Sequence, residues 1–549
     1  MREAYSLAER AWLPVLTEKN GREFIAIRDI AREDILRIDT GRADCDISVT
    51  EFLIGLLAIS LTPEEERDWT RRFHNLPSAG EIDEAVAPFA HALMLDGPGP
   101  RFLQDFEALQ GEEVPVSSLL MDAPGANTLK ENADHFVKRG QINRLSRPAA
   151  AIALLTLQTS APGGGAGHRT SMRGGGPVTT LIVPRLGEKP PSLWQILWAN
   201  TPLGFGLHPV DIAKAMPWLA PTRTSNKGDP GEITTPEHRD AVHPAQAFFG
   251  MPRRIRLNFR ENTRGEPCGL LGLVDEFVVE TYVTRPYGVN YTNWRHPLSP
   301  YYKPNEKSNE YLPLHIKSST VNYKQWIGLS LKEADGLRTP ANTVSVFMTD
   351  RAANLRIKPG DKRHRIGLLA CGYAMDNMKP LDFTEAMLPL ISTGDKVRDG
   401  ELASCAAAMV EAAELAASQL LSALKLALFK KNPPDNSKTP LDAPRARFWA
   451  ETEAGFYDRL REAAASDASG AAFDQAREDW LPIIRKAAFL IFDETAPVDS
   501  PEDPDVKYIV EARRFLNMAF GGYGPAGKKI FEALGLKVPE SKKAKGKAA

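Results

Sequence analysis

The stretch that decides how the second part of this chain folds is LASCAAAMVEAAELAASQLLSALKLALF, residues 402–429. Apolar residues dominate it, but Glu411, Glu414 and Lys425 interrupt the apolar run. A membrane-spanning helix needs roughly 20 predominantly apolar residues with few or no charges. The sequence therefore predicts a long amphipathic helix of a protein core, and we expect no membrane partner.

Three further helical segments follow this one, and helix breakers separate them. The four segments cover about 398–430, 443–466, 470–495 and 503–535, with Pro- or Gly-containing breakers between them. Short connections between long amphipathic helices favour antiparallel neighbours, hence a four-helix bundle. We expect this bundle to occupy residues 383–540 as its own domain, followed by a basic, disordered tail at 541–549.

Residues 1–382 have a different pattern. Apolar runs at 12–16 and 24–27 flank Asn20-Gly21 and predict a hairpin, because this dipeptide accepts the positive φ angles of a tight turn. Helices are expected at about 49–61 and 148–158, and a strand at 178–183. Short strand-like runs then alternate with turns to about residue 380. The fold class is therefore α+β: a large irregular mixed α/β domain at 1–382, followed by the bundle.

Composition and charge limit the possible functions. The 549 residues carry 68 Lys+Arg and 70 Asp+Glu, for a formal charge of -2. This balance excludes a highly basic nucleic-acid coat, so any nucleic-acid contact must come from a local patch. The cysteines lie far apart with no C-x-x-C pair, so we expect no disulfide framework, metal or cofactor. We recognise no signal peptide and expect a cytoplasmic protein.

The most unusual segment is APGGGAGHRTSMRGGGP, residues 161–177, in which seven of the seventeen residues are glycine. It does not fit a nucleotide-binding P-loop, because His168 stands where the second glycine belongs, the lysine is missing and a strand follows. Two interpretations stay open: a flexible hinge, or a loop whose backbone approaches a partner closely. In the second case Arg169 and Arg173 would add charge beside exposed amides, which suits a nucleic-acid phosphate or groove edge.

Two arginine-rich clusters lie further along the chain, at 253–264 and 351–365, each with a single acid. One such cluster is ordinarily a solvated face. Two of them plus a Gly-Arg loop, in a near-neutral chain, favour a local anionic partner, because Arg binds phosphates and guanine edges with paired hydrogen bonds. Interleaved aromatics at 282–302 are typical either of base stacking or of strand packing.

Sequence motifs of catalysis are missing. The chain contains no H-E-x-x-H and no G-x-S-x-G, and its ten histidines are mostly isolated. This favours a binding protein over an enzyme. A metal-dependent nuclease or hydrolase with an unrecognised site, and a scaffold that binds only protein, stay as alternatives.

Four ordered features are similar to those of one known family: Trp12-Leu13-Pro14-Val15, the segment APGGGAGHRTSMRGGGPVTT at 161–180, WRHPLSP at 294–300, and Gly372-Tyr373 within ACGYAMDNMKP at 370–380. Together with the four helices, they resemble the CasA family, the large subunits of type I-E CRISPR Cascade complexes, over essentially the whole chain. The resemblance implies a non-enzymatic subunit beside the 5′ end of the guide RNA and next to other Cascade subunits. Such a subunit reads the protospacer-adjacent motif (PAM) on double-stranded DNA, helps open the duplex and recruits a helicase-nuclease.

The resemblance also assigns residues. The DNA-facing glycine loop corresponds to Gly163, Gly164, Gly165, Ala166 and Gly167, with Ala166 standing where the family has a groove-facing glycine. Arg285 takes the place of a groove-reading lysine, and Asp376-Asn377 takes that of the pair that reads and wedges the duplex. In the charged loop at 127–147, Phe136 between His135 and Lys138 would anchor the chain in the complex. Some members have a cysteine cluster near the segment 282–302, where this chain has only Cys268, so no zinc is expected.

Overall fold

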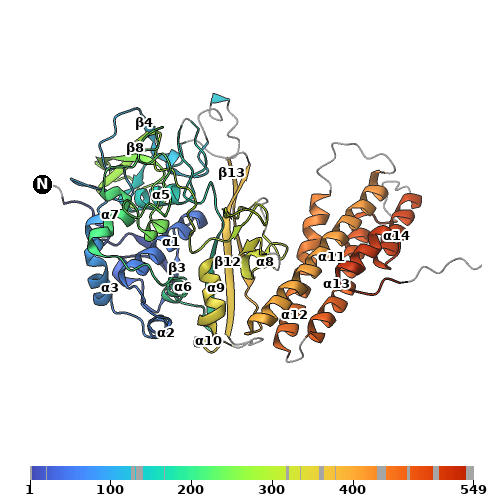
Figure 1. The fold of residues 1–549 in the computed structure, drawn as a ribbon. Helices are drawn as coiled ribbons and strands as arrows, with labels where there is room; N and C mark the ends of the chain where they lie inside the picture. Colours follow the sequence, from blue (N-terminus) through green and yellow to red (C-terminus); the bar gives the residue numbers. More distant parts are fainter. Residues whose placement is uncertain are drawn as a thin grey trace, which may run out of the picture. The chain divides into compact units, whose positions relative to one another are not determined.

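The structure is a computed structural model that describes residues 3–19, 21–124, 130–131, 140–165, 167–316, 321–333, 336–357, 364–376, 379–429, 441–466, 470–498 and 506–539. The chain folds as two compact units, whose elements are shown in Figure 1. The first comprises Met1–Val321, Leu337–Ile357 and Arg363–Met387. The second comprises Asn322–Gly336, Lys358–Lys362 and Leu388–Ala549.

The first unit begins with a small antiparallel sheet next to a buried helix. Strand β1 (Leu13–Thr17) pairs with β2 (Arg22–Ile25) and β3 (Ile35–Ile38), which confirms the predicted hairpin. Helix α1 (Ala43–Ser60) starts earlier than predicted and is buried on nearly all sides. Phe52 of α1 meets the rings of Trp12, Phe102 and Phe249 edge-on, at centroid distances of 6.2, 5.4 and 6.0 Å. This helix therefore lies at the centre of the core.

The other helices of the first unit are shorter and connected by irregular segments. They are α2 (Glu66–His74), α3 (Ala79–Val86), α5 (Arg147–Ser160), α6 (Leu193–Ala199), α7 (Ile212–Ala215), α9 (Asn342–Val346) and α10 (Ala352–Asn354). Helix α5 packs against α1 and ends directly before the glycine segment. The Ser146 side chain caps α5 by accepting the amide of Ala149. The core thus anchors one end of the glycine segment.

A second sheet is built around strand β8 (Phe277–Arg285). Strand β7 (Arg254–Glu261) pairs with one edge of β8, while β4 (Glu113–Pro115) and β5 (Leu145–Ser146) pair with the other. In this register Arg254 lies opposite Arg285. Arg285 therefore stands at the end of the strand, where the chain leaves the sheet.

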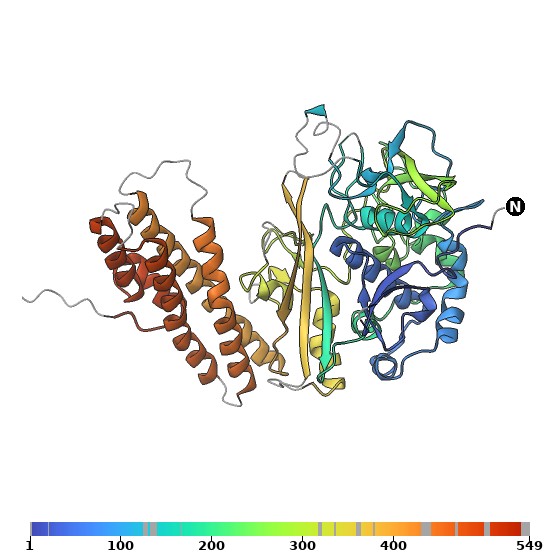
Figure 2. The same cartoon turned by 180° about the vertical axis from the view of Figure 1, so that it is seen from behind.

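A third sheet contains a long hairpin. Strand β12 (His364–Asp376) pairs with β6 (Thr179–Leu186) from Cys371↔Thr179 to His364↔Leu186, and with β13 (Lys379–Pro389) on its other side. Figure 2 shows these strands side by side from behind. Because β6 starts just after the glycine segment, the segment leads directly into the sheet that contains the hairpin. The small strands β9 (Tyr301–Tyr302), β10 (Leu312–Pro313) and β11 (Arg338–Thr339) form a separate sheet.

The second unit is the predicted bundle of helices. Its helices are α11 (Lys396–Phe429), α12 (Asp442–Ala465), α13 (Ala471–Thr495), α14 (Val506–Phe520) and α15 (Gly524–Ala533), and α11 contacts all the others. The prediction of one continuous helix at 503–535 is wrong, because the chain turns between α14 and α15. Gly522 has a φ of +77°, a conformation that glycine adopts without a steric penalty.

A segment from the middle of the chain completes the core of the bundle. Tyr323 is fully buried, stacks on Phe456 at 4.5 Å, and its hydroxyl lies 2.8 Å from Thr452 Oγ1. Helix α8 (Trp326–Ser330) brings in Trp326, whose indole nitrogen donates to the carbonyl of Pro389. This insertion was not predicted from the sequence.

Helix α11 is long and apolar enough to cross a membrane by length and composition alone, but half of its most apolar window is buried in the structure. A core helix passes the same test, so this one helix is weak evidence for a membrane.

Candidate nucleic-acid interface

Three segments that are far apart in the sequence meet at the glycine segment. The amide of Tyr287, just beyond β8, donates to the carbonyl of Gly167 over 2.8 Å. On the other side, Gly176 faces β12: a Cβ on Gly176 would lie 2.7 Å from Tyr373 Cβ and 2.6 Å from Met375 Cε. The structure therefore brings together the glycine segment, the end of β8 with Arg285, and the strand that ends at Asp376.

The first glycine run forms a tight, exposed turn. The amide of His168 donates to the carbonyl of Gly165 over 2.8 Å, and Gly165 and Gly167 have φ angles of +65° and +84°. Gly164 and Gly165 are exposed, whereas Gly163 and Gly167 are half-buried. A Cβ on Gly167 would lie 2.8 Å from the Tyr287 ring, so glycine is required there. Ala166 lies outside the described residues.

Arg253 lies beneath this turn. Its side chain is buried and donates to the carbonyl of Pro162, while its backbone exchanges two 2.9 Å hydrogen bonds with the Gln158 side chain. Burial lowers the pKa of Arg253 to about 10, so the guanidinium stays charged at neutral pH. Burial, together with the charge of Arg253, lowers the pKa of His168. The turn thus has a fixed positive charge behind it.

Arg169 fastens the same turn to its neighbours. Its Nε donates to Ser225 Oγ over 2.8 Å and its Nη2 to the Ser225 carbonyl over 3.0 Å. The amide of Ser225 in turn donates to the carbonyl of Tyr287. Sequence reasoning missed Ser225 and the support given by Tyr287 and Arg253, because nothing in their local sequence indicates contact with residues 162–169.

Arg173 requires a correction. We expected it to contact DNA, but its side chain is buried and forms a 2.6 Å ion pair with Glu51 of α1. It also donates to Thr179 Oγ1 and Ser299 Oγ over 3.0 and 2.8 Å. A buried cation with this set of acceptors is a structural element of the core, so we leave Arg173 out of the proposed interface.

Arg285 has the opposite environment. It is exposed, and no hydrogen bond or ion pair of its side chain is found among the described residues. Its register neighbour Arg254 is held instead by Asp105, at 2.6 Å. The guanidinium of Arg285 is therefore available to an external acceptor.

The remaining predicted residues are only partly described. Asp376 is exposed and is the last residue of β12 before the hairpin tip. Tyr373, three residues earlier, donates its hydroxyl to Asp44 of α1, which anchors β12 in the core close to the hairpin tip. Asn377, and the predicted anchor residues His135, Phe136 and Lys138, lie outside the described residues.

The two arginine-rich clusters are only partly exposed. In the first, Arg254 and Arg256 bind Asp105, and Arg260 lies near Glu113 and Glu280. In the second, Arg351 is buried, pairs with Glu66 at 3.0 Å and lies 4.3 Å over the Trp69 ring. Counting charges along the sequence therefore overstated the basic surface, because the partners of these arginines are distant in sequence.

The described part of the chain has no candidate metal site. No group of three or more His, Cys, Asp or Glu side chains there could hold a metal ion. All four cysteines are free and buried.

Comparisons with known proteins agree with this architecture. The family described as CRISPR-associated protein Cse1 matches residues 6–491. Among solved structures, CasA of Thermus thermophilus has 17% sequence identity and a TM-score of 0.68, covering 94% of this chain and 100% of that chain. Cse1 of Thermobifida fusca has 16% identity and a TM-score of 0.66, covering 97% and 98%. A chain of a structure named "CRISPR RNA-guided surveillance complex" has 16% identity and a TM-score of 0.63, covering 94% and 100%. At these identities, the structural likeness concerns the fold.

Proposed function

Since the chain belongs to the CRISPR-associated Cse1 family, the large subunits of Cascade, we propose that it reads the PAM on double-stranded DNA within an RNA-guided surveillance complex. In this proposal it also helps to open the duplex and recruits a helicase-nuclease. Its other partners are further Cascade subunits and the 5′ end of the guide RNA, in the cytoplasm. Base pairing with the guide reads the target sequence, so the protein needs to read only the short motif.

One observation carries the proposal: an exposed glycine turn, an exposed arginine and a hairpin end belong to segments that contact one another. Gly165 at the tip of the turn has no side chain and no atom within 4 Å of its Cβ position, so its backbone can approach a groove closely. Arg285 offers guanidinium donors to base acceptors, and the minor groove needs few contacts because it mainly distinguishes A·T from G·C. The hairpin end at Asp376-Asn377 is the proposed wedge, whose insertion costs a few kcal/mol that new contacts must offset.

Arg285→Ala in the assembled complex tests this function. We expect binding to a PAM-bearing duplex to weaken by about tenfold, which corresponds to about 1.4 kcal/mol, while binding to a duplex lacking the PAM changes much less. Arg264→Ala is the matched control, because Arg264 is also exposed and lies in the β7–β8 connection. Equal affinities of wild type and Arg285→Ala for the PAM duplex in a gel-shift titration would remove Arg285 from the interface.

The same preparations separate the alternatives. Metal-dependent cleavage of plasmid DNA that survives repurification would support a nuclease instead. PAM-duplex binding by the complex that is indifferent to the presence of this chain would support a scaffold that binds only protein.

A further inference from the structure

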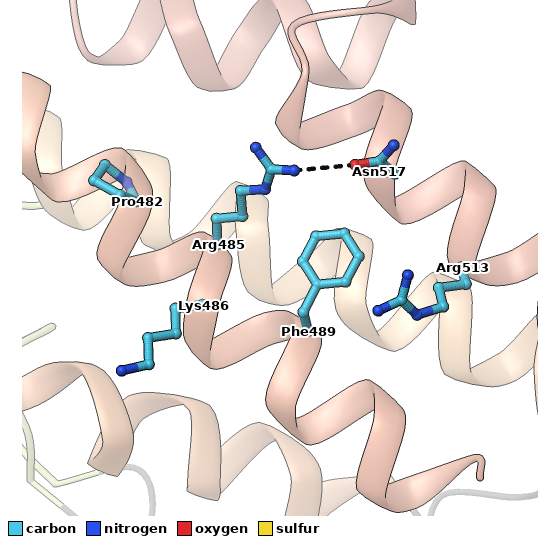
Figure 3. A pocket seen from close by; sticks show the side chains of 6 residues that line it. All are labelled: Pro482, Arg485, Lys486, Phe489, Arg513 and Asn517. Atoms are coloured by element: carbon cyan, nitrogen blue, oxygen red, sulfur yellow. Dashed lines mark hydrogen bonds between the residues drawn. The ribbon is translucent and has the colours of Figure 1, made fainter.

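A pocket of about 360 Å³ lies between helices α13 and α14 of the bundle (Figure 3). Its lining combines cations with an aromatic ring and consists of Pro482, Arg485, Lys486, Phe489, Arg513 and Asn517. These residues repeat at helical spacing on each helix, so they form one continuous strip on each side of the pocket. The function proposed above uses none of them.

The charges in this pocket are unbalanced. Arg447, Arg459, Arg461, Arg477 and Arg513 of the bundle all form ion pairs with acids. Arg485 instead donates to the amide oxygen of Asn517 over 3.2 Å (Figure 3), and no ion pair of Arg485 or Lys486 is found within the described ranges. Asp493 binds Arg513 with both oxygens, at 2.7 and 2.9 Å. Arg485 and Lys486 are thus left for external anions.

Exposed apolar side chains lie on the same two helices. Leu490 follows the pocket strip of α13 and is 41% exposed, and Val510 precedes Arg513 on the same face of α14 and is 56% exposed. Phe489 forms the floor between the two helices. Exposed apolar groups beside available cations are typical of a protein-binding surface.

These observations distinguish between two classes of partner. A single-stranded nucleic acid would use Phe489 as a stacking platform. However, the guanidinium carbons of Arg485 and Arg513 already lie over this ring, 5.6 and 5.2 Å from its centroid. A phosphate backbone would also bury none of the exposed apolar surface of Leu490 and Val510. A segment in which carboxylates alternate with apolar side chains would pair with the cations and cover the exposed Leu490 and Val510.

We propose that the α13–α14 pocket binds an acidic segment of a partner protein, whose carboxylates meet Arg485 and Lys486 and whose apolar side chains cover Leu490 and Val510. This surface belongs to the bundle alone, so the proposal does not depend on PAM reading.

The test uses the full-length chain and three fluorescein-labelled probes: an eight-residue peptide of alternating Glu and Leu, the same peptide with Gln for Glu, and a dT15 oligonucleotide. Fluorescence anisotropy should show binding of the acidic peptide and at least tenfold weaker binding of the Gln peptide. Arg485→Glu/Lys486→Glu should weaken binding of the acidic peptide at least tenfold. The affinity of the wild type for the acidic peptide should fall as the salt concentration rises.

The matched control is Lys425→Glu/Arg445→Glu, which makes the same charge change at two exposed bundle positions outside the pocket. Its affinity for the acidic peptide should stay within twofold of that of the wild type. Phe489→Ala should weaken the peptide several-fold, with circular dichroism confirming that the bundle is intact. Equal peptide affinities of the wild type and the pocket double variant would overturn the proposal. So would absence of peptide binding, or pocket-dependent binding of dT15 alone.

Discussion

The two glycine runs of residues 161–177 have nearly the same local composition and opposite environments. In the first run, Gly164 and Gly165 are exposed at the tip of a turn. In the second, Gly175 and Gly176 are buried, and a Cβ on Gly176 would collide with Tyr373 and Met375 of β12. Gly165 of the first run leaves its backbone open, since no atom lies within 4 Å of a Cβ there, whereas Gly176 of the second run must be glycine so that another strand can approach.

An arginine lies near each run and a histidine near each of these arginines, and the arginines differ in the same way. Arg253 behind the first run donates to a carbonyl and has no acid partner in the described parts of the chain, while Arg173 near the second forms a buried ion pair with Glu51. Burial and then the neighbouring arginine lower the pKa of both His168 and His296. The first run therefore lies at the surface and the second in the core. Each of the following changes tests this difference.

The largest effect is expected for Arg173→Met. It leaves the Glu51 carboxylate buried without its partner, which typically costs about 3–5 kcal/mol of stability. Urea unfolding of the full-length chain measures this cost. Glu51→Gln/Arg173→Met should regain part of the lost stability, because it removes both charges. A double variant no more stable than Arg173→Met would contradict the role of the ion pair.

The glycines themselves give the next effect. Gly176→Ala combines a φ of +61° with a clash against β12, and we expect about 3 kcal/mol of destabilisation. Gly165→Ala has a similar φ of +65° but no atom within 4 Å of the new Cβ, so about 1 kcal/mol is expected. Thermal unfolding compares the two variants. Equal losses of stability would mean that the two runs do not differ as described.

The smallest effect is a pH dependence. His296 is buried and its pKa is lowered well below the ordinary value, first by burial and then by Arg173. Below about pH 6.5, His296 therefore takes up a proton in the unfolded chain but not in the folded chain. Stability should fall by up to about 1.4 kcal/mol per pH unit from there down to the folded pKa.

His296→Gln removes this proton uptake and should make the free energy of unfolding depend less on pH between about pH 6.5 and pH 5. Differences between variant and wild type isolate the effect, because Asp46, whose pKa is raised to about 6 mainly by burial, contributes with the opposite sign in both proteins. His168→Gln should change the slope less, since His168 is only half-buried. A steeper change for His168→Gln than for His296→Gln would contradict the comparison.

Local patterns predicted much of the fold. The apolar periodicity of α1 and α5, the turn signal after β1 and the long segments of the bundle all correspond to observed elements. The break between α14 and α15 could also have been predicted, since Gly521-Gly522 is followed by Gly524-Pro525. The insertion of Tyr323 and Trp326 into the bundle was not, because its cause is a hydrophobic core formed by residues more than a hundred positions away.

The sequence by itself determined the fold class, the helices α1, α5, α11, α12 and α13, and the presence of a glycine-rich turn, because propensity and periodicity act between near neighbours. Only the tertiary structure decided which charges are available. Arg173 and Arg285 are both arginines beside motifs of the same resemblance, yet Glu51 neutralises one and the other is exposed. Burial and ion pairing depend on side chains brought together by folding, and the bundle pocket around Arg485 exists for the same reason.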